Sequence, residues 1–294
     1  MIIGAGAIAL EFASMWNAAG SKVTLLIRKD RVLSAWDRRA GTTLTRELKR
    51  HGVNIITRAA SPMWTLARTL VPPCTTRAKA RTANKASGAK SPLSPSGVTR
   101  SPTAWGVTID DHGHVATDAY GRTDKPGVWA VGDVTAGHAL AHRAFEQGIV
   151  IAETIAGLNP KPVDEATVPQ IVFSFPEAAS VGLTVEQAQA REDLIEIKET
   201  NYPMLANARM LMSGTAGSLT IVSGCDATNP DTPRVLGVHM VSQMASDIIA
   251  EAEQLVGNHV PLADAARLVH PHPTFSETLG EALLKADGRP LHTR

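Results

Sequence analysis

The sequence predicts an α/β fold in which alternating strands and helices at the N-terminus are followed by an α+β domain at the C-terminus. Three observations predict this fold. Short apolar runs alternate with helix-forming segments across residues 2–56. Residues 218–223 and 234–241 have the alternating side chains of two hairpin strands, joined by a polar loop with Asn229, Pro230 and Asp231, and Cys225 is expected in the hairpin turn. Residues 245–256 repeat apolar side chains at helical spacing.

The first element is a short strand at residues 1–3 that runs into a glycine-rich turn. Gly4, Gly6 and Ala9 follow the pattern G-x-G-x-x-G/A, and a helix is expected at residues 10–19. The first glycine permits the tight turn, the second lets the backbone approach a pyrophosphate, and the small third residue lets the helix pack on the strand. The helix N-terminus adds free N–H groups and a positive dipole end. The segment is therefore Rossmann-like, and these three residues are candidates for dinucleotide binding.

The residues that follow the second strand, expected at 21–27, indicate which dinucleotide binds. An NAD site carries an acidic residue there to hold the ribose 2′-hydroxyl. Here Arg28 and Lys29 come first, followed by Asp30 and Arg31. Because guanidinium and ammonium groups pair directly with a 2′-phosphate, the pattern favours NADP over NAD. The alternative is a solvated basic turn.

A helix at residues 37–51 and a third strand at residues 53–56 complete the predicted nucleotide-binding segment, residues 1–58. This segment resembles the NAD(P)-binding domain of the class I pyridine nucleotide-disulfide oxidoreductases, the family of glutathione reductase, dihydrolipoyl dehydrogenase and mercuric reductase. The family passes reducing equivalents from NAD(P)H through FAD and a dithiol to a disulfide substrate. The resemblance implies that Glu11 lies near the nicotinamide. Taken alone, Glu11 could simply be a carboxylate favoured by the helix dipole.

The resemblance resumes at residues 106–160. Residues 127–131 are expected to form a strand that ends at Gly132 and Asp133, and a helix is expected at residues 139–156. In the family an aspartate at this position contacts FAD, so the resemblance assigns Asp133 to flavin binding. A helix cap is the alternative role for this carboxylate.

Residues 165–294 resemble the C-terminal dimerisation domain of the family, which implies a homodimer or pairing with an intact relative. Near its end, His272 precedes Glu277 by five residues. A carboxylate that orients an imidazole makes a general acid–base near neutral pH. The resemblance assigns His272 to protonation of the leaving thiolate, in the site of the partner subunit, and Glu277 to orienting it. We do not assign His270 to catalysis.

Residues 59–105 interrupt the resemblance. They contain no Asp or Glu, seven Lys or Arg, and many Pro, Ser and Thr residues. Such a composition does not bury enough apolar surface to offset its ordering entropy. Two interpretations are open: a basic linker that binds nucleic acid or an acidic surface, or a shifted reading frame that later returns to register. The abrupt change of composition at both edges favours the second.

The cysteine inventory bears on activity. In the family an N-terminal FAD domain carries two cysteines separated by four residues, whereas this sequence contains only Cys74 and Cys225. We therefore expect that the redox dithiol and the main FAD domain are absent and that the chain does not reduce disulfides alone. Two other functions stay open: a non-enzymatic dimerisation module, and nucleic-acid binding through the basic stretch.

Composition limits the partners further. A formal net charge of +1 and an aromatic content of 4% argue against a nucleic-acid partner. The sequence contains no run of about 18 apolar residues and no leader segment, so we expect no membrane association. We expect a cytoplasmic protein, because its cysteine usage fits a reducing compartment. Cys and His residues with the spacing of a metal site are also missing.

Overall fold

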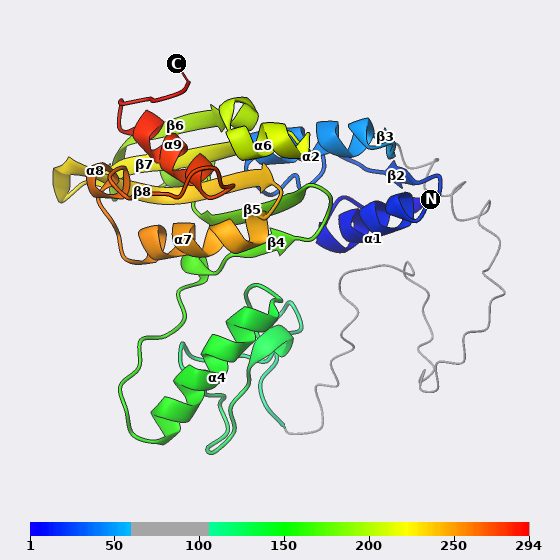
Figure 1. Ribbon diagram of the computed structural model, residues 1–294. Helices are drawn as coiled ribbons and strands as arrows, with labels where there is room; N and C mark the ends of the chain where they lie inside the picture. The colour runs from blue at the N-terminus through cyan, green and yellow to red at the C-terminus, as the bar shows by residue number, and fades with distance from the viewer. Residues whose placement is uncertain (60–105, 294) are drawn as a thin grey trace. The chain divides into compact units, whose positions relative to one another are not determined.

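A computed structural model describes residues 1–59 and 106–293 of the chain. The described residues fall into two compact units: residues 106–170 form the second unit, and the remainder form the first. Figure 1 draws both units. The predicted irregular stretch lies outside the described residues except for Ala59, and Cys74 lies outside them as well.

The N-terminal part of the first unit is a three-stranded parallel sheet with the strand order β1-β2-β3. Its elements are β1 (Ile2–Ile3), α1 (Ala7–Ala18), β2 (Thr24–Leu26), α2 (Arg38–Arg50) and β3 (Asn54–Ile56). Helix α1 begins three residues earlier than predicted, because Gly6 already serves as its N-cap. Helix α2 begins where the Asp37 carboxylate accepts a hydrogen bond from the backbone N–H of Ala40 at 2.7 Å. The predicted α/β order is confirmed in this segment.

The C-terminal part of the first unit is a five-stranded sheet with the order β4-β5-β8-β7-β6. Its strands are β4 (Gln170–Val172), β5 (Glu177–Gly182), β6 (Leu194–Pro203), β7 (Ser218–Asp226) and β8 (Asn229–Ser242). Its helices are α5 (Val185–Gln189), α6 (Ala208–Ser213), α7 (Ala245–Gly257), α8 (Leu262–Ala265) and α9 (Glu277–Ala286), with a short 3-10 turn, η3 (Met204–Ala206). Helix α7 packs on β5 and β8, and α9 packs on β6 and β7, in one apolar core. Residues of the opposite face, including Ala178 and Val241, join the core of the nucleotide-binding segment.

Two details of the hairpin differ from the prediction. The residues expected to form its polar loop, Asn229 to Asp231, belong to β8, so the turn is confined to positions 227 and 228. Cys225, which the sequence suggested to lie in that turn, is fully buried in β7. Backbone pairing between β7 and β8 continues through these polar residues, and Asp226 pairs with Asn229. The strands therefore extend beyond the last apolar side chain and include Cys225.

A buried histidine lies in the middle of this sheet. His239 of β8 is 1% exposed, and its Nε2 lies 3.0 Å from the carbonyl oxygen of Leu183. A carbonyl only accepts, so Nε2 carries the proton and Nδ1 accepts from the Ser180 hydroxyl at 2.7 Å. Burial lowers the pKa of His239, against the raising effect of nearby carboxylates such as Asp37. His239 is therefore neutral in the folded chain.

This burial predicts a pH dependence of stability. Because the folded pKa lies below the ordinary value of 6.5, the unfolded chain binds more protons as the pH falls below that value. The free energy of unfolding should then fall by up to about 1.4 kcal/mol per pH unit below pH 6.5 through this group. Urea unfolding of the wild type and of His239→Gln at several pH values measures it. An unchanged pH slope in the variant would contradict the assignment.

The second unit is built around one long helix. It contains η1 (Gly132–Val134), α4 (Ala141–Ile155) and η2 (Glu165–Thr167). Arg143 of α4 is 3% exposed and contacts Glu165 at 2.5 Å, the hydroxyl of Thr135 and the carbonyl of Ala136. These contacts fix the turn that precedes the helix.

The strand predicted at residues 127–131 is wrong. Trp129 makes only an isolated bridge, to Arg122, and a 3-10 turn begins at Gly132. A strand needs a continuous neighbour to pair its backbone groups, and residues 106–170 do not provide one here. Across residues 1–59 and 106–293, no helix is both long enough and apolar enough to cross a membrane.

Candidate functional site

The glycine turn lies at the carboxyl end of β1. Gly4 has a φ of +136°, a conformation that side chains disfavour, and its N–H donates to the carbonyl of Leu26 at 3.1 Å. The N–H of Leu33 donates to the carbonyl of Ala5 at 2.9 Å, so the loop after β2 also holds the turn. Ala9 packs close to Gly4, because a Cβ placed on Gly4 would lie 3.5 Å from that of Ala9. The turn is thus fixed by backbone contacts on two sides.

Gly6 is different, because the protein itself does not require a glycine there. Its φ is −89°, which any residue adopts, and a Cβ built on it meets no atom within 4 Å. The space beside Gly6 is therefore open, directly in front of the first turn of α1. No side chain caps that helix, so its first N–H groups are available to a ligand. An open space at an uncapped helix N-terminus fits the pyrophosphate of a dinucleotide.

Arg28 and Lys29 lie next to this turn. Ile3 pairs with Leu26, so the carboxyl ends of β1 and β2 are adjacent. The two basic residues follow β2 almost immediately, and both are exposed. Neither side chain has a hydrogen-bond partner among the residues that the structure describes. Both cations are thus free to meet an anionic group of a bound nucleotide.

Glu11 has a contact that the sequence did not predict. One of its carboxylate oxygens accepts a hydrogen bond from the backbone N–H of Phe173 at 3.0 Å. Ser14, one turn further along α1, accepts from the N–H of Phe175 at 3.2 Å. Helix α1 is therefore tied to the loop that follows β4, and Glu11 has a structural role in this unit.

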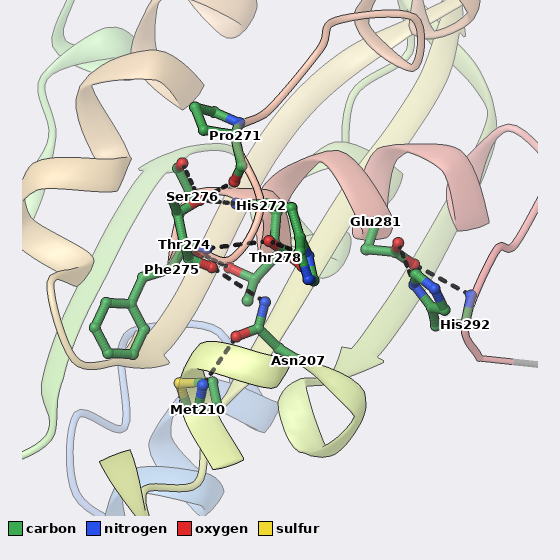
Figure 2. Close-up of polar contacts among 11 residues, drawn as sticks. Asn207, Met210, Pro271, His272, Thr274, Phe275, Ser276, Thr278, Glu281 and His292 are labelled. Carbon is green, nitrogen blue, oxygen red and sulfur yellow. Dashed lines mark hydrogen bonds and ion pairs between the residues drawn. The ribbon is translucent and has the colours of Figure 1, made fainter. Parts of the chain in front are cut away.

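The structure brings His272 and Glu277 together. Nδ1 of His272 lies 3.1 Å from the Glu277 carboxylate. The imidazole is exposed, with 67% of its side-chain surface accessible, whereas the carboxylate is only 13% exposed. The turn that holds this imidazole is drawn in Figure 2. A partly buried carboxylate beside an exposed imidazole fixes the tautomer and leaves the outer nitrogen for proton transfer.

The turn between the two residues is held by Thr274. Its N–H donates to Glu277 at 3.0 Å, and its hydroxyl accepts from the N–H of Glu277 at 3.3 Å. This reciprocal pair has the hydrogen-bond pattern of a capping box, but it lies in the turn just before α9, whose N-cap is Ser276. The pattern Thr-x-x-Glu is visible in the sequence, so Thr274 could have been found there.

Asn207 was missed by sequence reasoning. It is 2% exposed, its amide donates to the carbonyl of Thr274 at 3.2 Å, and its oxygen accepts from the N–H of Met210 at 2.9 Å. Figure 2 shows this side chain between α6 and the His272 turn. No local pattern signals the contact, because Asn207 lies 67 residues from Thr274 in the chain.

A second imidazole–carboxylate pair lies further along α9. His292 Nδ1 is 2.7 Å from Glu281, the pair on the right of Figure 2. His270, by contrast, is mostly buried, and its Nε2 contacts Glu251 at 2.8 Å. The hydrogen bond that His270 donates to the Glu251 carboxylate raises the pKa of His270. This pairing is consistent with a structural His270.

The remaining predicted residues are Asp133, in the second unit, and Cys225, in β7 of the first unit. Asp133 is exposed in η1 of the second unit, where the N–H of the preceding Gly132 donates to the side chain of Gln147 at 2.9 Å. Burial raises the pKa of the Cys225 thiol, which disfavours the nucleophilic thiolate. Among residues 1–59 and 106–293, no group of three or more potential ligands could hold a metal ion.

Comparison with known proteins confirms the resemblance to the family. Residues 1–148 match the family model described as pyridine nucleotide-disulphide oxidoreductase. Residues 168–283 match the model of the dimerisation domain of the same family.

Curated relatives include the dihydrolipoyl dehydrogenases of Bacillus subtilis, 33% identical over 99% of this chain, and Cupriavidus necator, 34% identical over 99%. The chain spans 61% and 60% of the length of these two relatives.

Solved structures show the same fold. LpdA from Mycobacterium tuberculosis superimposes with a TM-score of 0.76 at 23% identity, over 97% of this chain and 60% of that one. The HOCl-induced flavoprotein disulfide reductase RclA from Escherichia coli superimposes with a TM-score of 0.74 at 24% identity, over 96% of this chain and 63% of that one. The two family models, which match residues 1–148 and 168–283, show that the chain belongs to the pyridine nucleotide-disulphide oxidoreductase family.

Proposed function

We propose that this polypeptide supplies the dinucleotide cradle and the thiol acid–base pair of an FAD-dependent, NADPH-using disulfide reductase. The contact between His272 Nδ1 and Glu277 at 3.1 Å carries the proposal. Nδ1–H donates to the carboxylate, and Nε2 has no partner among the described residues. Nε2 then takes a proton from an attacking thiol and returns it to the thiolate that leaves. As the resemblance implies, this exposed imidazole serves the site of a partner subunit.

Gly4, Gly6 and Ala9 would hold the pyrophosphate of the dinucleotide at the start of α1. When bound, the nucleotide supplies reducing equivalents as a hydride. Arg28 and Lys29 would pair with a 2′-phosphate, which supports NADP over NAD. One carboxylate oxygen of Glu11 holds Phe173, and we propose that the other lies toward the nicotinamide.

The family is FAD-dependent, with NAD(P)H as the usual reductant. Asp133 fits a role at the flavin, because an exposed carboxylate on a fixed turn can accept hydrogen bonds from the ribityl hydroxyls. Asp133 would hold and orient the ribityl group of FAD without taking part in proton transfer.

We further propose that these 294 residues do not turn over a disulfide unaided. The sequence has two cysteines, and the described one, Cys225, is fully buried in β7. A dithiol would have to come from outside these 294 residues, for example from an intact relative that pairs through the dimerisation domain. The match of residues 168–283 to that domain supports a dimer, either with itself or with such a relative. We propose a cytoplasmic location, because a reducing compartment would keep the thiols of this chain and of its partner reduced.

A rescue experiment tests the acid–base role. The Bacillus subtilis relative, with its own acid–base histidine replaced, is co-purified with this chain and assayed for lipoamide reduction. We expect the wild-type chain to restore turnover, and His272→Gln to restore about 10²- to 10⁴-fold less. His292→Gln is the matched control, because it alters the other His–Glu pair of α9. Equal rescue by His272→Gln in a verified mixed dimer would rule out the role.

A further inference from the structure

The first unit contains a cavity of about 750 Å³ beside α2, which we call the α2 cavity. One wall is α2, and the other comes from α5, β6 and the start of β7. Figure 1 shows α2 next to α6 in this part of the molecule. The charged residues that line the cavity are Arg38, Arg39, Arg46, Glu47, Arg50, Glu186 and Glu199. Arg28 and Lys29 do not line it, so it is distinct from the proposed dinucleotide site.

The two walls are joined by contacts between segments far apart in the sequence. Arg39 Nε lies 3.0 Å from Glu199, and the buried hydroxyl of Ser218 donates to that of Thr43 at 3.0 Å. Arg50 donates to the carbonyl of Gly214 at 3.3 Å. The α2 cavity is therefore a fixed part of the fold.

Its guanidinium groups keep donors available for a ligand. Glu47, 2% exposed, accepts from Arg46 Nε at 3.2 Å and from Arg50 Nη1 at 3.4 Å. These bonds leave both Nη groups of Arg46 without a partner among the described residues. The guanidinium of Arg38 has no such partner at all, and it is exposed. Four arginines against three glutamates leave an excess of positive charge.

We propose that the α2 cavity binds a phosphorylated small molecule that carries more than one anionic group. Guanidinium groups bind phosphate through paired, charge-assisted hydrogen bonds. Arg38, Arg46 and Arg50 are spread over roughly 18 Å of helix at about 1.5 Å per residue, which suits an elongated anion rather than a single small ion. A ligand there would contact both α2 and the C-terminal sheet. This binding function is separate from, and additional to, the proposed reductase role.

Calorimetric titration of the whole chain with inorganic tripolyphosphate tests the proposal at about 0.15 M salt. We expect saturable binding that Arg38→Gln weakens about tenfold, as expected for the loss of one charge-assisted contact. Arg38→Gln removes no described side-chain contact, so the fold should be unaffected. Arg46→Gln is a second variant with the same expected effect. Arg267→Gln, an exposed arginine away from the cavity, should change the affinity by less than about twofold.

Three outcomes would overturn the proposal: no saturable binding, equal weakening by Arg267→Gln, or full displacement of tripolyphosphate by stoichiometric NADPH. The last would place the anion at the glycine turn. If instead NADPH fails to bind while Arg38→Gln weakens tripolyphosphate binding, the result supports the anion site in the α2 cavity and contradicts the proposed nucleotide site.

Discussion

Replacing Gly6 by valine is expected to lower the affinity for NADPH by at least about 100-fold while leaving the fold intact. A phosphate displaced from the helix N-terminus loses several charge-assisted hydrogen bonds, each worth about 1.5–3 kcal/mol. The backbone at Gly6 has an ordinary φ, and a Cβ there meets no protein atom within 4 Å. The new side chain would therefore fill only the space assigned to the ligand.

Fluorescence titration with NADPH measures this loss, and thermal unfolding checks the fold. Gly148→Ala is the control, since its added Cβ also meets nothing within 4 Å and Gly148 belongs to α4 of the second unit. Undiminished NADPH affinity in Gly6→Val would show that the dinucleotide does not approach this turn.

A second large effect is expected at Gly237 of β8. A Cβ on this residue would lie 2.1 Å from the backbone oxygen of Leu183 and 2.9 Å from its nitrogen. Gly237 pairs with Gly182 of β5, so the close approach lies inside the sheet that carries the C-terminal core. Backbone atoms cannot move aside as a flexible side chain can. Gly237→Ala should therefore lower the free energy of unfolding by about 3 kcal/mol.

Urea unfolding of the purified variant measures this change. Gly148→Ala again serves for comparison, and it should be neutral or slightly stabilising because alanine favours a helix interior. A shift of the Gly237→Ala midpoint no larger than that of Gly148→Ala would mean that the strands can separate without cost.

The features that the sequence predicted well are local. The glycine turn and the His272–Glu277 pair each lie within a few residues, so spacing alone reveals them. Asp37 likewise begins α2 through a contact three residues ahead. The predicted domain boundaries and the roles of the site residues stay predictions.

The features that the sequence did not predict depend on distant partners. Asn207 supports the His272 turn across 67 residues, and Glu11 contacts Phe173 across 162 residues. The expected strand before Asp133 failed because its pairing partner is absent from the described part of its unit. Cys225 was placed in a turn because polar residues follow it, whereas backbone pairing continues beyond it.

The most direct test of the account is an anaerobic titration of the purified 294-residue chain with NADPH and NADH, followed by addition of a disulfide. We expect saturable binding of NADPH, weaker binding of NADH, and no disulfide-dependent oxidation of either nucleotide until a dithiol-bearing relative is added. Disulfide-dependent NADPH oxidation by the chain alone would contradict the account.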